Sequence, residues 1–171
     1  MAQATASRRA QLSDAGAIAR IYSEGIADRV ATFETEARTA AEVEQVLRNL
    51  DARHPAVVAE RDGEVIAFAW TSTYRSRPCY DQVAEFSVYV GREARGSGCG
   101  REVLLALIEA AEAAGLHKLV SRVFPENTAS RALCRSTGFR EVGTYARHGQ
   151  LDGEWRDCVI VERLLGAAAA G

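Results

Sequence analysis

Three glycines in the segment from Arg95 to Gly100, Arg-Gly-Ser-Gly-Cys-Gly, have the clearest chemical use of any residues in this sequence. The segment follows the β-rich run Val83–Val90 and precedes a stretch of helical periodicity that Gly115 closes. Glycine lets the backbone approach an anion closely, and a helix N-terminus adds a favourable dipole. The segment therefore predicts a site for a phosphate-bearing ligand, with a glycine-rich turn that binds nothing as the alternative. It fails the dinucleotide fingerprint, whose third glycine would fall at Arg101, and the Walker pattern, because no Gly-Lys-Ser/Thr follows.

Further short segments occur in order along the chain. Asn127-Thr-Ala-Ser130 is followed by Leu133 and by Gly138-Phe139. The others are Thr32-Phe33-Glu-Thr35, Arg75-Ser-Arg77 with Tyr80-Asp81, Glu85-Phe-Ser-Val-Tyr-Val90 and Gly153-Glu-Trp155-Arg-Asp157. Together with the glycine segment they resemble the GNAT N-acetyltransferases. The resemblance extends, over about residues 10–165, to the phosphinothricin and arsinothricin acetyltransferase branch of that family.

The resemblance implies that acetyl-CoA binds in a V-shaped gap between two splayed parallel strands. Backbone groups of Val88 and Val90 would pair with the pantetheine arm, and the N–H groups of residues 96–101 would hold the pyrophosphate. Asn127 and Ser130 would lie on the far side of the cofactor, although Asn127 also fits a helix N-cap. The expected acetyl-CoA contacts are Val88, Tyr89, Val90, Arg95, Gly96, Ser97, Gly98, Cys99, Gly100, Arg101, Asn127 and Ser130.

Glu85 is the residue expected to act in catalysis. It stands in an otherwise uncharged, β-rich run, where a carboxylate is unexpected on burial grounds. An acceptor amine is largely protonated at neutral pH and must lose a proton before it attacks a thioester. An unperturbed α-amino group has a pKa of about 8, so a carboxylate acting through a water could remove that proton. By resemblance Glu85 falls at the general base proposed for the branch; a solvated glutamate on an edge strand is the alternative.

Two arginines, Arg75 and Arg77, lie in the polar loop before that strand, with Tyr80 close in sequence. Arginine makes bidentate, charge-assisted hydrogen bonds to carboxylate, phosphinate or arsinate groups. The resemblance places an aromatic residue at Phe33 and a basic residue near Arg77 around the acceptor. Phe33, Arg75, Arg77 and Tyr80 are therefore the expected acceptor-binding residues, and solvated loop arginines are the alternative.

At one position the chain departs from the family. Many members place a tyrosine near the leaving thiolate, and the phosphinothricin enzymes a histidine, whereas this chain has Cys134. Either solvent protonates the CoA thiolate or the second step differs here. No histidine adjoins Cys134 in a readable pattern, so we do not expect a covalent nucleophile. His148 is a further candidate for the acceptor cleft, and Trp155 is interpreted as an aromatic that packs on the sheet.

The elements that position these residues follow from hydrophobic periodicity. Strands are expected around residues 8–12, 56–60, 65–70, 83–90, 118–124, 142–149 and 155–164, with an Asp-Gly hairpin turn at 62–63. Helices are expected after Ser13 or Asp14, from the Thr39/Glu42 capping box to Leu50, from the glycine segment to Gly115, and from Asn127 to Gly138. The expected fold is one α/β domain over residues 1–171 with a mixed central sheet and flanking helices. Its core spans about residues 8–165, and the tail 166–171 is expected to fray.

Composition bounds the class of protein. The 171 residues, 47% hydrophobic and 26% charged, suit one globular domain. A formal net charge of −2 gives no positive field for nucleic acid or an anionic membrane, so neither partner is expected. No apolar stretch is long enough to span a membrane and the N-terminus lacks a signal core, so we expect a cytoplasmic protein. The four cysteines form no Cys-x-x-Cys pair and the three histidines no ligand spacing, which predicts reduced thiols and no metal.

The sequence therefore predicts an N-acetyltransferase that moves acetyl from acetyl-CoA to the α-amino group of a small anionic amino acid, by direct attack in a ternary complex. Phosphinothricin, methionine sulfoximine and arsinothricin are the leading acceptors, with resistance to such analogues as the consequence. A homodimer is expected only from the resemblance. Two alternatives stay open: an acetyltransferase for another amine, such as a peptide N-terminus or a polyamine, and an acyl-CoA-binding module without turnover.

Overall fold

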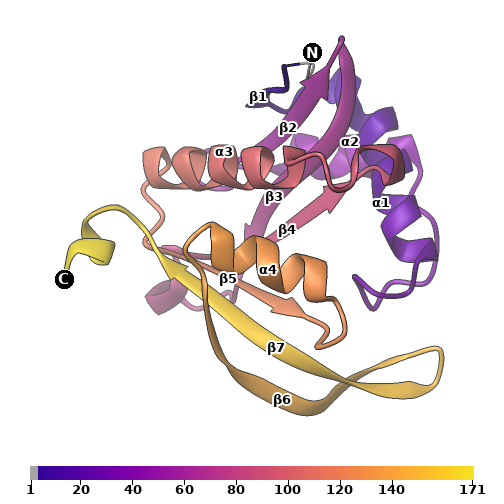
Figure 1. Ribbon diagram of the computed structural model, residues 1–171. Coiled ribbons are helices and arrows are strands. Elements are labelled where there is room, and N and C mark those ends of the chain that lie inside the picture. Colours follow the sequence, from indigo (N-terminus) through magenta and orange to yellow (C-terminus); the bar gives the residue numbers. More distant parts are fainter. Residues whose placement is uncertain (1–3) are drawn as a thin grey trace.

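The computed structural model describes residues 4–171, in which helices flank one sheet (Figure 1). In chain order the main elements are β1 (Ala6–Arg9), α1 (Ala15–Ala27), α2 (Ala40–Asn49), β2 (Ala56–Arg61), β3 (Glu64–Thr73), β4 (Val83–Val90), α3 (Cys99–Ala113), β5 (Lys118–Val123), α4 (Thr128–Ser136), β6 (Arg140–Leu151) and β7 (Glu154–Leu164). The strand order is β1-β2-β3-β4-β5-β7-β6, and all neighbours are antiparallel except β4 and β5. The predicted mixed sheet is confirmed. None of the helices in the described residues is long and apolar enough to cross a membrane.

The parallel strands β4 and β5 part after a short common segment. Three residue pairs join them, from Val83–Lys118 to Glu85–Val120. Beyond that point β4 continues beside β3 and β5 beside β7, so the two strands diverge toward their C-terminal ends (Figure 1). Because α3 follows β4 and α4 follows β5, both helices begin at the open end of the resulting V.

Two hydrophobic cores lie on opposite faces of the sheet. On one face α3 buries Leu104 and Leu107, together with the rest of the apolar stripe predicted for it, against β2, β3 and β4. On the other face α1 buries Ile18 and Ile21 against Phe68 of β3. Because side chains alternate between the faces of a strand, these central strands are covered on both sides, which makes them a fixed support for the site.

A third, smaller cluster holds the β6–β7 hairpin against the segment between α1 and α2. Its buried members are Phe124, Leu151 and Cys158, and the ring of Phe33 packs edge-on against Phe124 at a centroid distance of 4.8 Å. Gly149 lies under Phe33, where an added Cβ would come within 2.7 Å of the ring. Phe33 is thereby fixed beside the C-terminal half of the sheet.

Local sequence signals are confirmed at the main turns and caps. Asp62 and Gly63 both have positive φ, as a type I′ hairpin turn requires, and Thr39 and Glu42 form the capping box of α2. The expected bounds of the first strand are wrong, because β1 ends at Arg9 with its pairing to β2 and the chain then forms a 3-10 turn, η1 (Leu12–Asp14). The tail expected to fray contains a 3-10 helix, η4 (Gly166–Ala170).

Candidate active site

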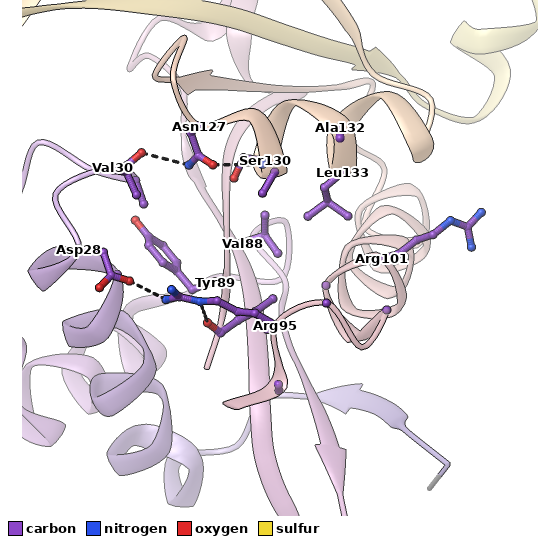
Figure 2. A pocket seen from close by; sticks show the side chains of 18 of the residues that line it. Asp28, Val30, Val88, Tyr89, Arg95, Arg101, Asn127, Ser130, Ala132 and Leu133 are labelled. Carbon is purple, nitrogen blue, oxygen red and sulfur yellow. Dashed lines mark hydrogen bonds and ion pairs between the residues drawn. The ribbon is translucent and has the colours of Figure 1, made fainter. Parts of the chain in front are cut away.

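The open end of the V holds a cleft of about 580 Å³ (Figure 2). Its walls are the end of β4, the glycine segment, the first turns of α4 and the residues just after α1. Most of the residues expected to contact acetyl-CoA line it, namely Val88, Tyr89, Val90, Arg95, Gly96, Gly98, Gly100, Arg101, Asn127 and Ser130. The fold therefore brings segments that are distant in sequence to one cavity.

The glycine segment presents backbone N–H groups to this cleft. Gly96 and Gly98 have φ values of 76° and 89°, in the left-handed region that favours glycine, and Gly98 is the N-cap residue of α3. In the part of the chain that the structure describes, neither of their N–H groups donates to a protein atom. The N–H groups of Cys99 and Gly100 lie in the first helical turn, where no intrahelical acceptor exists. The N–H of Arg101, in contrast, already donates to the Gly98 carbonyl at 3.0 Å.

The side chains of Ser97 and Cys99 turn away from the cleft. The Ser97 hydroxyl donates to the Ala94 carbonyl at 2.6 Å and accepts from Arg61 at 3.1 Å. The Cys99 thiol is 1% exposed and lies 3.5 Å from the same carbonyl. Both side chains therefore stabilise the turn, so the predicted contacts of Ser97 and Cys99 with acetyl-CoA would be made through the backbone.

Arg95 extends across the base of the cleft in Figure 2 and forms an ion pair with Asp28 at 2.8 Å. Its Nε also donates to the Val90 carbonyl at 3.3 Å. Asp28 pairs with Arg92 as well, at 2.7 Å, and hydrogen bonds from Arg92 and then Arg95 hold the pKa of this carboxyl below its ordinary value. The side chain of Arg101 points away from the cleft in the same view. Arg95 is thus the cationic side chain that spans this cleft.

Asn127 connects the two walls of the cleft. Its Oδ1 accepts a hydrogen bond from the Ser130 N–H at 3.1 Å, and its Nδ2 donates to the Val30 carbonyl at 3.1 Å. The N-cap interpretation of Asn127 is therefore confirmed, and it is compatible with a place on the cleft wall. Both ends of the amide are occupied by protein, so the exposed part of this wall is the first turn of α4, including Ser130.

A narrow space of about 60 Å³ continues the cleft into the base of the V. It shares Val88, Asn127 and Ser130 with the cleft and also borders Arg122 and Cys134. Its lining includes both Phe86, whose side chain lies in the α3 core, and Arg122 of β5. A reacting group that enters along β4 would arrive there.

Glu85, on β4, pairs with Arg122, one of the residues that border this space. The Nη2 atom of Arg122 is 2.9 Å from one carboxylate oxygen of Glu85 and 3.1 Å from the other. The Glu85 side chain is 29% exposed, and β4 has a neighbour on each side. The edge-strand alternative for Glu85 is therefore wrong, since this carboxylate lies in the middle of the sheet.

Sequence reasoning alone misses Arg122 and Asp28. Arg122 interrupts the β-rich run of β5 just as Glu85 interrupts that of β4, so the same burial argument could have singled it out. Side-chain alternation along β5 then places it on the face of Val120, toward which Glu85 also points. Asp28 carries no such signal, because its partners Arg92 and Arg95 are distant in sequence.

Among the described contacts, none of the expected acceptor residues hydrogen-bonds to Glu85. Arg75 and Arg77 are exposed in the loop after β3, and Tyr80 ends a 3-10 turn, η2 (Pro78–Tyr80). The guanidinium of Arg75 lies 5.3 Å from the ring centroid of Tyr74. Tyr74, with smaller contributions from Tyr80 and from Tyr145 of β6, holds the pKa of Arg75 above its ordinary value.

Cys134 lies at the base of the V as a neutral thiol. It is 2% exposed, and burial raises its pKa to about 11, which is the opposite of what a nucleophilic thiolate needs. All four cysteines are free. Residues 4–171 contain no group of three or more His, Cys, Asp or Glu side chains that could hold a metal ion.

The two other candidates lie on the C-terminal hairpin. His148 stands beside Tyr145, at a ring-centroid distance of 4.6 Å, on an exposed and irregular part of β6. Trp155 is 58% exposed near the β6–β7 turn. Its interpretation as a sheet-packing aromatic is therefore wrong, because it lies beyond the apolar cluster that this hairpin buries.

The split sheet and the free backbone N–H groups of the cleft suit a ligand that carries phosphates. The chain belongs to the acetyltransferase (GNAT) family, whose family profile matches residues 19–139, and it is an N-acetyltransferase that uses acetyl-CoA.

Related proteins carry more specific names. The phosphinothricin N-acetyltransferase of Alcaligenes faecalis is 36% identical over 161 residues, 90% of this chain and 79% of that protein. The L-methionine sulfoximine/L-methionine sulfone acetyltransferase of Pseudomonas paraeruginosa is 32% identical over 160 residues, 91% of each chain. Among solved structures, the phosphinothricin acetyltransferase of Sinorhizobium meliloti in complex with AcCoA aligns with a TM-score of 0.90 at 31% identity, covering 100% of this chain and 92% of that one.

Proposed function

We propose that this enzyme acetylates the α-amino group of a small anionic amino acid of the phosphinothricin, methionine sulfoximine or arsinothricin type. The observation that carries the proposal is the Glu85 carboxylate held by Arg122, which also borders the narrow space beside the cleft. The names of relatives at 36% and 32% identity support the acceptor class. Acetylation of a toxic analogue would confer resistance to it.

The cleft fits acetyl-CoA, which supplies the acetyl group as a thioester. The free N–H groups of Gly96 and Gly98 and the N-terminus of α3 suit the pyrophosphate. Val88 and Val90 lie where β4 has left β5, so their backbone groups can pair with the pantetheine arm. The Val90 carbonyl must then release the Nε of Arg95, which it accepts in the free enzyme.

Glu85 acts as the general base in this proposal, directly or through a water. It accepts the proton that the acceptor ammonium loses, and the freed amine forms a C–N bond to the acetyl carbon as the C–S bond breaks. The nitrogen then loses a second proton to solvent, which leaves the neutral amide. Solvent protonates the departing thiolate. Cys134 takes no covalent part, because burial keeps its thiol protonated.

The remaining expected residues provide selectivity. Arg75 and Arg77 supply exposed positive charge for the acidic groups of the acceptor, and a cationic polyamine would be repelled by them. Phe33, packed on Phe124, and Tyr80, packed on Tyr74, supply aromatic surface. The acceptor class therefore follows from charge, and the individual acceptor from the shape of this surface.

A thiol-release assay with acetyl-CoA and a panel of acidic, neutral and basic amines tests the proposal. We expect the highest kcat/KM with anionic α-amino acids. A preference for polyamines or peptide N-termini would assign another acceptor class. Tight acetyl-CoA binding without release of thiol for any acceptor would indicate a binding module. The homodimer stays a prediction, which light scattering during size-exclusion chromatography checks.

A further inference from the structure

Arg122 and Glu85 form an isolated charge pair at the base of the V. A single guanidinium nitrogen makes both contacts, at 2.9 and 3.1 Å. Within residues 4–171 the Arg122 side chain makes no other hydrogen bond or ion pair to protein, and neither does that of Glu85. The guanidinium therefore keeps donors available for a second acceptor, and the carboxylate keeps free lone pairs.

Both side chains are accessible from the face of the sheet opposite α3. Alternation along β4 and β5 puts Ala84 and Leu119 into the α3 core and turns Glu85 and Arg122 to the other face. Arg122 is 46% exposed and also borders the narrow space that leads to the cleft. A small molecule on this face can thus reach both charges beside the narrow space that Arg122 borders.

We infer that Arg122 binds the α-carboxylate of the acceptor while Glu85 receives its α-ammonium group, an inference that rests on the proposed function. In an α-amino acid the ammonium and carboxylate groups are attached to the same carbon. Arg122 and Glu85 present the complementary charges at hydrogen-bonding distance from each other. The zwitterion therefore exchanges one protein ion pair for two pairs with the enzyme.

The exchange is favourable because the Arg122–Glu85 ion pair of the enzyme without acceptor is weak. Both partners are partly solvated, and exposed ion pairs contribute little. The acceptor in turn gains charge-assisted hydrogen bonds at each end. Drawing Arg122 onto the α-carboxylate also frees the Glu85 oxygens to take the proton of the ammonium group, so acceptor binding prepares the base.

This arrangement divides the recognition of two acidic groups between two elements. Arg122 on β5 binds the α-carboxylate, and Arg75 and Arg77 in the loop after β3 are left for the acidic group of the side chain. Changing only the α-carboxylate of the acceptor should therefore affect only the contact with Arg122.

The test compares kcat/KM for phosphinothricin and for its α-carboxamide in the wild type, Arg122→Ala and Arg122→Lys. We expect Arg122→Ala to reduce the value for phosphinothricin roughly 10- to 150-fold, which corresponds to about 1.5–3 kcal/mol, and to change the value for the carboxamide much less. Arg122→Lys should restore part of the loss, because it keeps the charge but not the planar fork. Arg48→Ala is the matched control: it removes an arginine that pairs with Glu44 on the exposed face of α2 and should change neither value.

Each other outcome has a defined meaning. Equal losses for the acid and the carboxamide would overturn the inference and leave Arg122 as a positioning residue for Glu85. Unchanged kinetics in Arg122→Ala, or a wild type that uses both acceptors equally well, would also overturn it while leaving the proposed function intact. A wild type that binds acetyl-CoA but acetylates neither acceptor and no other anionic amino acid would refute the proposed function, and the inference with it. Arg122→Gln replaces the alanine variant if thermal unfolding shows that the latter is not folded.

Discussion

Replacing Gly98 by valine separates the cost to the fold from the cost to acetyl-CoA binding. Gly98 has a φ of 89°, so a residue with a branched side chain there is strained by about 1–3 kcal/mol. A Cβ at this position meets no protein atom within 4 Å. The strain is therefore the only loss in the free protein, and we expect the free energy of unfolding to fall by that amount. The added side chain would lie beside the free N–H groups of the glycine segment.

The effect on the acyl donor should be larger than the effect on the acceptor. Loss of one charge-assisted hydrogen bond costs roughly 1.5–3 kcal/mol, or about 10- to 150-fold in affinity. Since several N–H groups face the same place, Gly98→Val should weaken acetyl-CoA binding by at least this factor and leave the KM of the acceptor nearly unchanged. Titration calorimetry with acetyl-CoA and initial-rate kinetics measure the two quantities.

Gly115→Val provides the matched control for this prediction. Gly115 has a φ of 81°, also has no atom within 4 Å of an added Cβ, and stands just beyond the opposite end of α3. It should lose similar stability and keep its affinity for acetyl-CoA. If the two variants lose the same stability and bind acetyl-CoA equally well, the glycine segment does not bind the pyrophosphate.

Three further changes test other parts of the molecule. Glu85→Gln should lower kcat by ~10²–10⁴-fold at neutral pH, and kcat should recover partly as the pH rises because more of the acceptor amine is unprotonated. A folded variant with wild-type kcat from about pH 6 to about pH 9 would remove Glu85 from the mechanism. Arg77→Ala should lower kcat/KM for an anionic amino acid roughly 10- to 150-fold and leave the KM of acetyl-CoA unchanged. Arg75→Ala should cause a smaller loss, because Arg75 already lies over Tyr74. Equal losses with a neutral amino acid would show that these arginines do not bind the acidic group. Asp14→Asn should lower the free energy of unfolding by about 1.5–3 kcal/mol at neutral pH, because Arg8 binds both carboxylate oxygens, at 2.8 and 2.9 Å. Hydrogen bonds from Arg8 hold the pKa of Asp14 below its ordinary value, so this contribution is complete above the unfolded pKa of about 3.9 and is lost as the pH falls through the lower folded value. Urea unfolding across that range measures it, and a difference between the two proteins that does not change with pH would contradict this account.

The parts of the fold that rest on local interactions could be predicted from the sequence. The Asp62-Gly63 turn, the Thr39/Glu42 capping box and the stripe of α3 each depend on residues a few positions apart. The first strand was misjudged because pairing with β2 sets its end. Asp14, one of the two expected N-cap positions, is the N-cap residue of α1, but its carboxylate binds Arg8 and makes no side-chain cap bond to the helix.

The candidate site was predictable to the extent that its motifs are contiguous. The residues of the glycine segment and of the Asn127–Ser130 segment do meet at one cleft. The partner of Glu85 could not be identified, because the sequence does not say which strand lies beside β4 or how far the two strands remain paired. Arg122, two positions beyond the last pair of that parallel segment, reaches Glu85 only because of that register.

Few backbone pairs join the two halves of the sheet, and side chains across the V provide much of the remaining connection. The Asn127 amide donates to the Val30 carbonyl, Phe33 packs on Phe124, and Arg29 forms an ion pair with Asp152 at 3.0 Å. One end of each of these three bridges belongs to the short segment after α1. That segment therefore connects the two walls of the V and sets the angle between them. A molecule bound to both walls would hold the same angle. Substitution of Arg29, which neither lines the cleft nor is an expected acceptor-binding residue, should alter the KM values of donor and acceptor together.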